Sequence, residues 1–138
     1  RFLHNLKDVK DRGGRIITFN PVIEQGLVSF VDPQNPLAMV TGKETIISDQ
    51  YHQVRSGGDI AAILGLCKVV VEADDKAREA GWDAIIDHDF VAEHTTGFDQ
   101  FIACCRAADW ADIERASGLT EAALRDAAMV YIQAEKVI

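Results

Sequence analysis

A short apolar run between two turn signals constrains the fold of this chain more than any other feature. Residues 15–19 (Arg-Ile-Ile-Thr-Phe) are rich in β-branched side chains and show no clean alternation with polar ones. This pattern is typical of a parallel strand that is covered on both faces. A helical pattern at 2–12 ends in a Gly-Gly pair before the run, and Asn20-Pro21 follows it. Because proline lacks the amide that a ladder requires, the strand is expected to end there.

The rest of the chain indicates a long connection, a second strand and a series of helices. Glycines and prolines interrupt the segment from 22 to 50, where one strand is possible at 27–31. A second strand is expected at 51–55, and a buried helix at 60–73. Further helices are expected at 88–94, 98–107, 110–116 and 121–136, with Val137-Ile138 returning to the sheet. This order predicts an α/β fold of three layers with a mostly parallel sheet and a helix-rich second half.

Helix boundaries are marked by capping residues. Asp59, Asp87, Asp109 and Thr120 each precede a helical pattern. Their side-chain oxygens can accept hydrogen bonds from the free amides of a first helical turn. Gly118 is expected to end the helix before it.

The length and the net charge of the chain limit the classes of protein to which it can belong. The 138 residues suit one globular domain, and 22 acidic against 14 basic side chains give a net charge of -8. An acidic balance argues against nucleic-acid binding, which needs a face rich in Lys and Arg. No run of about 18 apolar residues and no secretory signal are present, so a cytoplasmic protein without a membrane span is expected. The start at Arg1 without methionine suggests a piece of a longer polypeptide.

The cysteines and histidines do not match the common catalytic or metal-binding patterns. Cys67, Cys104 and Cys105 lack the spacing of a zinc or iron-sulfur site and are interpreted as ordinary buried thiols. The stretches 87–89 (Asp-His-Asp) and 93–94 (Glu-His) fit neither of the common zinc-protease spacings. We interpret them as helix caps and solvated polar faces, and we predict no catalytic residue and no metal ligand in this chain.

Two loops at strand ends form the candidate binding site. Open α/β sheets bind ligands outside the carboxyl ends of their strands, where Asn20–Glu24 and Ser56–Asp59 are expected. Glycines let backbone amides approach a phosphate, and the carboxylate of Asp59 can accept both N1-H and N2-H2 of a guanine. The alternative is that Gly-Gly-Asp forms only a turn and a cap. Neither G-x-G-x-x-G nor G-K-[ST] occurs, which disfavours a standard dinucleotide fold or P-loop.

Four segments together carry a resemblance to a known family: 12–21 (RGGRIITFNP), 53–61 (QVRSGGDIA), 90–98 (FVAEHTTGF) and 113–119 (IERASGL). The order and spacing of these segments resemble those of the molybdopterin oxidoreductases of the dimethyl sulfoxide reductase type. The nearest likeness is to formate-dehydrogenase-like alpha subunits that are linked with acid resistance in bacteria. The resemblance covers essentially the whole chain.

The resemblance implies that residues 1–138 form a single Rossmann-like domain. Such a domain holds one pterin guanine dinucleotide of a bis-molybdopterin guanine dinucleotide centre with molybdenum. Family relatives commonly carry polar residues where this chain has Val22 and Ile23, which favours Glu24 and the main chain as contacts. The implied cofactor-binding residues are Asn20, Pro21, Glu24, Gly57, Gly58 and Asp59.

The resemblance also implies the properties of a longer parent enzyme. That enzyme would carry out a two-electron oxidoreduction, with formate oxidation as the nearest analogy, and this piece alone would be inactive. Its 4Fe-4S cluster and the protein ligand of molybdenum would lie outside the chain. Its partners would be a small-molecule substrate, an electron-transfer partner and the remaining domains. Two alternatives stay open: a non-catalytic module that binds a nucleotide or a partner through 25–50, and the middle domain of a thiamine-diphosphate enzyme.

Overall fold

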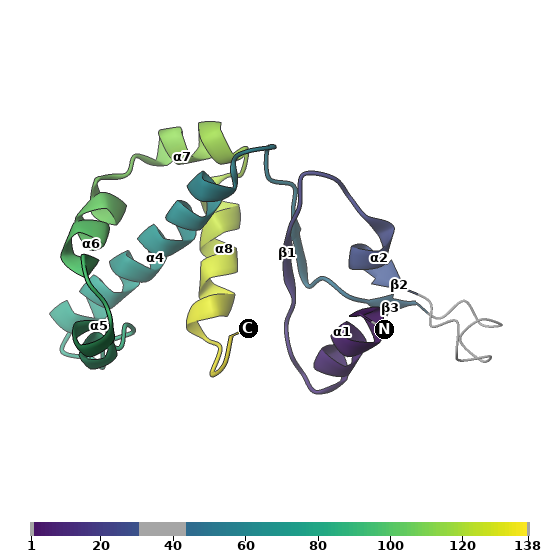
Figure 1. Cartoon of the computed structure of the whole chain (residues 1–138), viewed down its shortest axis with the longest axis horizontal. Helices are drawn as coiled ribbons and strands as arrows, with labels where there is room; N and C mark the ends of the chain where they lie inside the picture. The colour runs from purple at the N-terminus through teal and green to yellow at the C-terminus, as the bar shows by residue number, and fades with distance from the viewer. Residues whose placement is uncertain (1, 31–43, 138) are drawn as a thin grey trace. The chain divides into compact units, whose positions relative to one another are not determined.

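The computed structural model describes residues 2–30 and 44–137, and the chain divides into two compact units, Arg1–Gln53 and Val54–Ile138 (Figure 1). The first unit contains α1 (Phe2–Asp11), β1 (Ile17–Phe19), α2 (Gln25–Val28), β2 (Ser29–Phe30), β3 (Thr45–Ile46) and β4 (Gln50–His52). The second contains α4 (Asp59–Glu79), α5 (His88–His94), α6 (Phe98–Ala107), α7 (Trp110–Ser117) and α8 (Glu121–Ile132).

The first unit contains a parallel strand pair. β1 pairs with β4 in the register Ile17 to Gln50, Thr18 to Tyr51 and Phe19 to His52. β2 and β3 form a separate antiparallel pair. The predicted parallel pairing is therefore present, but the described sheets have only two strands each. A three-layer Rossmann-like fold is not confirmed.

Asp49 anchors the start of the parallel pair. One carboxylate oxygen of Asp49 accepts the amide of Ile16 at 2.7 Å, and the other pairs with the ammonium of Lys10 on α1. Partial burial alone would raise the pKa of Asp49, but the hydrogen bonds from Lys10 and Ile16 outweigh it and lower that pKa. The turn between α1 and β1 depends on Gly13, whose φ of 83° lies in the left-handed region.

Helix α4 forms the centre of the second unit and contacts α6, α7 and α8 (Figure 1). The core of this unit is apolar and includes Val69, Val71, Ile102, Ile113, Leu124 and Ala128. Lys68 is buried among these helices, and its ammonium donates to the carbonyls of Cys105 and Arg106 at the end of α6. The buried ammonium is tolerated because these carbonyls accept its hydrogen bonds and because the Glu72 carboxylate lies 3.6 Å from it as a counter-charge.

Most of the predicted helices are confirmed, including the exact bounds of α5 and α6. Asp87, Asp109 and Thr120 cap their helices as predicted, and Gly118 ends α7 with a φ of 76°. The prediction that Asp59 is an N-cap is wrong, because Gly58 occupies that position and Asp59 is the first residue of α4.

Several boundaries differ from the expectation. The first strand is Ile17–Phe19 rather than 15–19, the second is Gln50–His52 rather than 51–55, and α4 extends to Glu79 rather than ending at 73. Residues 25–28 form a helical turn, so only Ser29–Phe30 of the possible strand at 27–31 is extended, and Val31 lies outside the described residues. α8 ends at Ile132 rather than at 136. Val137 is not in a strand, and Ile138 lies outside the described residues.

The cysteines differ in burial. Cys105 is buried, Cys67 is half-buried and Cys104 is exposed, so the prediction of burial is wrong for Cys104. The reason is the helical period, because Ile102 and Cys105 share the inner face of α6 and Cys104 falls on the outer one. Burial raises the pKa of the Cys67 and Cys105 thiols, which keeps them protonated and unreactive.

No helix within residues 2–30 and 44–137 is long and apolar enough to cross a membrane. That residues 1–138 form one cofactor-binding domain stays a prediction.

Candidate functional site

The first candidate loop follows β1 and is held close to the strand pair. The amide of Asn20 donates to the carbonyl of His52 at 3.0 Å, which extends the ladder by one bond. The side-chain amide of Asn20 then donates to the Glu24 carboxylate at 3.1 Å. The structure thus brings together two of the predicted residues, while Pro21 between them is exposed.

A tyrosine that the sequence analysis did not single out holds the middle of this loop. The Tyr51 hydroxyl donates to the carbonyl of Val22 at 2.7 Å and accepts the amide of Glu24 at 3.1 Å. Glu24 is also the N-cap of α2, and its carbonyl accepts the amides of Leu27 and Val28. The local sequence around Tyr51 contains no signal for these contacts, because they depend on the pairing of two strands.

The second candidate loop precedes α4 and contains two glycines with different roles. Gly57 has a φ of 78°, and a side chain there would meet no atom within 4 Å. Gly58 is buried, and a Cβ atom there would lie 2.6 Å from the carbonyl oxygen of Ala116. Close packing against α7 therefore requires glycine at 58, whereas Gly57 leaves open space above the loop.

Arg55 fastens this second loop to the end of α7. Its amide donates to the carbonyl of Ser117 at 2.7 Å, and its guanidinium donates to the carbonyl of Arg115 at 2.7 Å. The carbonyl of Arg55 accepts the amide of Gly58, also at 2.7 Å, which closes the turn. The residues next to Arg55 in the sequence give no signal for this role, because its partner carbonyl at Arg115 lies 60 residues away along the chain.

Asp59 emerges from this fastened turn at the amino end of α4. Its side chain is exposed, and within the described part of the chain no residue forms a hydrogen bond or ion pair with it. The aligned peptide dipoles of a 21-residue helix favour a negative charge at this end. The carboxylate thus has both oxygens available for a ligand that donates two hydrogen bonds.

The predicted residues belong to different units. Asn20, Pro21 and Glu24 lie in the first unit, and Gly57, Gly58 and Asp59 lie in the second. The structure brings together the members of each loop. That the two loops share one ligand stays a prediction.

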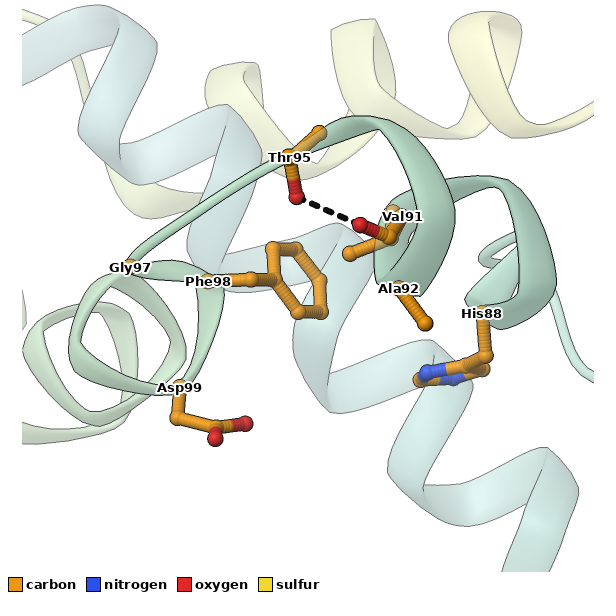
Figure 2. Close-up of a pocket in the computed structure, with 7 residues that line it drawn as sticks. All are labelled: His88, Val91, Ala92, Thr95, Gly97, Phe98 and Asp99. Carbon is orange, nitrogen blue, oxygen red and sulfur yellow. Dashed lines mark hydrogen bonds between the residues drawn. The ribbon is translucent and has the colours of Figure 1, made fainter.

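A further pocket, of about 390 Å³, lies between α5 and α6 (Figure 2). The Phe98 ring points toward α5, and its centroid lies 6.3 Å from that of His88 in an edge contact. The Thr95 hydroxyl donates to the carbonyl of Val91 at 2.7 Å. The pocket is lined by His88, Val91, Ala92, Thr95, Gly97, Phe98 and Asp99.

One ring nitrogen of His88, Nε2, is engaged by a buried carboxylate. Asp74 on α4 is 2% exposed and accepts three hydrogen bonds, from the amides of Ile85 and Ile86 and from His88 Nε2 at 2.8 Å. Burial alone would raise the pKa of Asp74, but these hydrogen bonds, led by that of Ile86, lower it. His94 contacts Phe90 and Glu93 at the surface. Within the described ranges, no three His, Cys, Asp or Glu side chains gather as they would around a metal ion.

Comparison with known proteins adds a functional context. No family model matches the chain. The chain is 39% identical over all of its 138 residues to protein YdeP of Escherichia coli, and it spans 18% of that protein. It is 30% identical over the same length to a protein of Mycobacterium tuberculosis named as an uncharacterized oxidoreductase, of which it spans 17%.

A third relative is named for its cofactor. The thiosulfate reductase molybdopterin-containing subunit PhsA of Salmonella typhimurium is 25% identical over 97 residues, which are 70% of this chain and 9% of that protein. The chain is thus similar in sequence both to a protein named as an oxidoreductase and to one named as a molybdopterin-containing subunit. Since it spans less than a fifth of each of these relatives, the activity of any whole protein to which it belongs is a matter for proposal. The resemblance to formate-dehydrogenase-like subunits stays a prediction.

Proposed function

We propose that this chain holds one pterin guanine dinucleotide of a bis-cofactor molybdenum centre in a formate-dehydrogenase-like oxidoreductase. The observation that carries the proposal is the exposed carboxylate of Asp59, which has no protein partner among the described residues and begins a long helix. The molybdopterin-containing relative supports the class of cofactor.

The groups on the two loops fit such a cofactor. A guanine presents N1-H and N2-H2 side by side, and the two oxygens of Asp59 can accept both. The open space above Gly57 lets the cofactor approach the backbone. Asn20, Pro21 and Glu24 supply the second set of polar and main-chain contacts, with Glu24 oriented by its hydrogen bond from Asn20.

The role of this chain in the parent enzyme is to bind and orient. When bound, the molybdenum cofactor supplies two-electron redox chemistry, and we propose formate as the first substrate to test. An iron-sulfur cluster of the 4Fe-4S type, the protein ligand of the metal and the docking site of the electron partner lie in other domains under this proposal. The proposed compartment is the cytoplasm.

The central test compares Asp59→Ala and Asp59→Asn in the full-length parent, purified without oxygen. Molybdenum is measured by elemental mass spectrometry and guanine nucleotide after acid release. Loss of two charge-assisted hydrogen bonds is expected to cost about 3 kcal/mol, or on the order of a hundredfold in nucleotide affinity. Asparagine keeps one acceptor but places an amino group against guanine N2-H2, so Asp59→Asn is expected to lose nucleotide as well.

Asp126→Ala is the matched control, because Asp126 is another exposed carboxylate, on α8. This control is expected to retain the full complement of about two guanine nucleotides per molybdenum. Nucleotide content in Asp59→Ala equal to that of the parent would refute guanine recognition by Asp59. A well-folded parent that lacks both metal and nucleotide would refute the cofactor proposal and favour a module that binds a free nucleotide or a protein.

A further inference from the structure

Tyr51 connects one strand of the parallel pair to the loop that follows the other. It lies in β4, opposite Thr18 of β1. Its single hydroxyl contacts the loop twice, at the carbonyl of Val22 (2.7 Å) and at the amide of Glu24 (3.1 Å). These two atoms flank Ile23, so the hydroxyl spans the centre of the loop.

Little else holds the middle of this loop. The hydrogen bond from Asn20 Nδ2 to Glu24 Oε1, at 3.1 Å, links the first and last side chains of the loop. The side chains between them do not pack into a core, because Val22 is 64% exposed and Ile23 is 57% exposed. The backbone shape at 22–24 therefore depends on the Tyr51 hydroxyl more than on apolar burial.

We infer that Tyr51 is a positioning residue for nucleotide binding, whose hydroxyl fixes the Asn20–Glu24 backbone in the shape that receives the guanine dinucleotide. Tyr51 acts through Val22 and Glu24 and does not itself contact the ligand. The inference rests on the proposed function. Its physical basis is preorganisation, since a loop that is already ordered loses less conformational entropy when the ligand binds.

The test uses Tyr51→Phe in the full-length parent, because this change removes the hydroxyl and keeps the ring. Thr18→Val is the matched control. It also removes one hydroxyl hydrogen bond from β1, the 2.6 Å bond between Thr18 and Ser48, and Ser48 lies outside the loop 20–24. For each protein we would measure the rate of guanine nucleotide loss, the hydrogen exchange of a peptide containing residues 20–24, and the thermal midpoint.

Tyr51→Phe is expected to lose nucleotide about tenfold faster than the parent, which corresponds to about 1.4 kcal/mol. The peptide containing Glu24 is expected to exchange faster in this variant, because the Glu24 amide has lost its acceptor. Thr18→Val is expected to keep the parent's rates in both measurements at a similar thermal midpoint. Faster nucleotide loss in Tyr51→Phe than in Thr18→Val, at similar thermal midpoints of the two variants, separates positioning of the loop from general stabilisation of the fold.

Three outcomes would overturn the inference. Nucleotide loss from Tyr51→Phe at the parent's rate would refute the role of the hydroxyl and leave the proposed function intact. Equal acceleration in Tyr51→Phe and Thr18→Val would assign the effect to general stability. A parent that contains no guanine nucleotide would refute the proposed function and this inference together.

Discussion

Replacement of the buried carboxylate of Asp74 tests how the second unit holds the segment between α4 and α5. One oxygen of Asp74 accepts both backbone amides, from Ile85 at 2.8 Å and from Ile86 at 3.0 Å. The other oxygen contacts His88 Nε2 at 2.8 Å. Asp74→Ala removes all three contacts, whereas Asp74→Asn can keep the oxygen that serves the two amides.

The two substitutions therefore differ in their expected cost. An unsatisfied buried donor costs about 1–3 kcal/mol, and the amides of Ile85 and Ile86 are only partly buried. We expect Asp74→Ala to lower the free energy of local opening by about 3 kcal/mol, or roughly a hundredfold in hydrogen-exchange protection. Asp74→Asn loses only the charged acceptor for His88, and a decrease of about 1 kcal/mol is expected.

Hydrogen exchange read by mass spectrometry measures these effects in peptides that cover residues 82–90. Peptides from the first unit provide the internal control, since Asp74 belongs to the second unit. Equal loss of protection in Asp74→Asn and Asp74→Ala would refute the reasoning, because it would show that the charge and not the amide acceptor holds the segment.

The same carboxylate has a pH signature. The pKa of Asp74 is lower in the folded chain than its ordinary value, so the ionised form stabilises the folded state. This contribution is complete above about pH 4 and decreases as the pH falls through the folded pKa. We therefore expect the difference in protection between the parent and Asp74→Asn to shrink below about pH 4. A difference that stays constant down to pH values well below that would contradict the assignment.

Two pairs of substitutions test packing in the second unit, each by urea unfolding of the 138-residue chain followed by circular dichroism. Lys68→Met leaves the last carbonyls of α6 without their donor and is expected to lower the free energy of unfolding by about 1–3 kcal/mol. Lys76→Met, at an exposed position of α4, is expected to change it little. Gly58→Ala forces a Cβ atom against the carbonyl of Ala116 and is expected to cost about 1–3 kcal/mol, whereas Gly57→Ala meets open space and costs about 1 kcal/mol for its left-handed backbone. Equal effects within either pair would contradict the packing described.

Local signals predicted much of this structure. The bounds of α5 and α6 follow from apolar periodicity, and Asp87, Asp109 and Thr120 cap their helices because a cap depends on three or four neighbouring residues. Asp59 breaks the rule since Gly58, buried against α7, takes the cap position. A pattern of adjacent residues contains no information on such a distant neighbour.

The contacts that shape the two candidate loops were not predictable in the same way. Tyr51 acts through the pairing of β4 with β1, and Arg55 acts on carbonyls at the end of α7. The residues proposed to face the ligand could be predicted from their position after a strand and from the family resemblance. The residues that hold those loops could be identified only from the tertiary structure. Lys68 is a related case, because its burial depends on the end of α6 lying beside α4.

The attachment of Arg55 to α7 has a consequence for the order of folding. The turn that presents Asp59 is attached through Arg55 to the carbonyls of Arg115 and Ser117, so its final support requires a chain segment of about 60 residues to be complete. During synthesis from the amino terminus, Asp59 leaves the ribosome well before these partners. A molecule truncated before α7 would carry the whole Gly-Gly-Asp sequence and yet lack the support that gives the turn its geometry. Under the proposed function, the ability of this unit to bind the nucleotide therefore arises late, when the helix that holds the turn has been made.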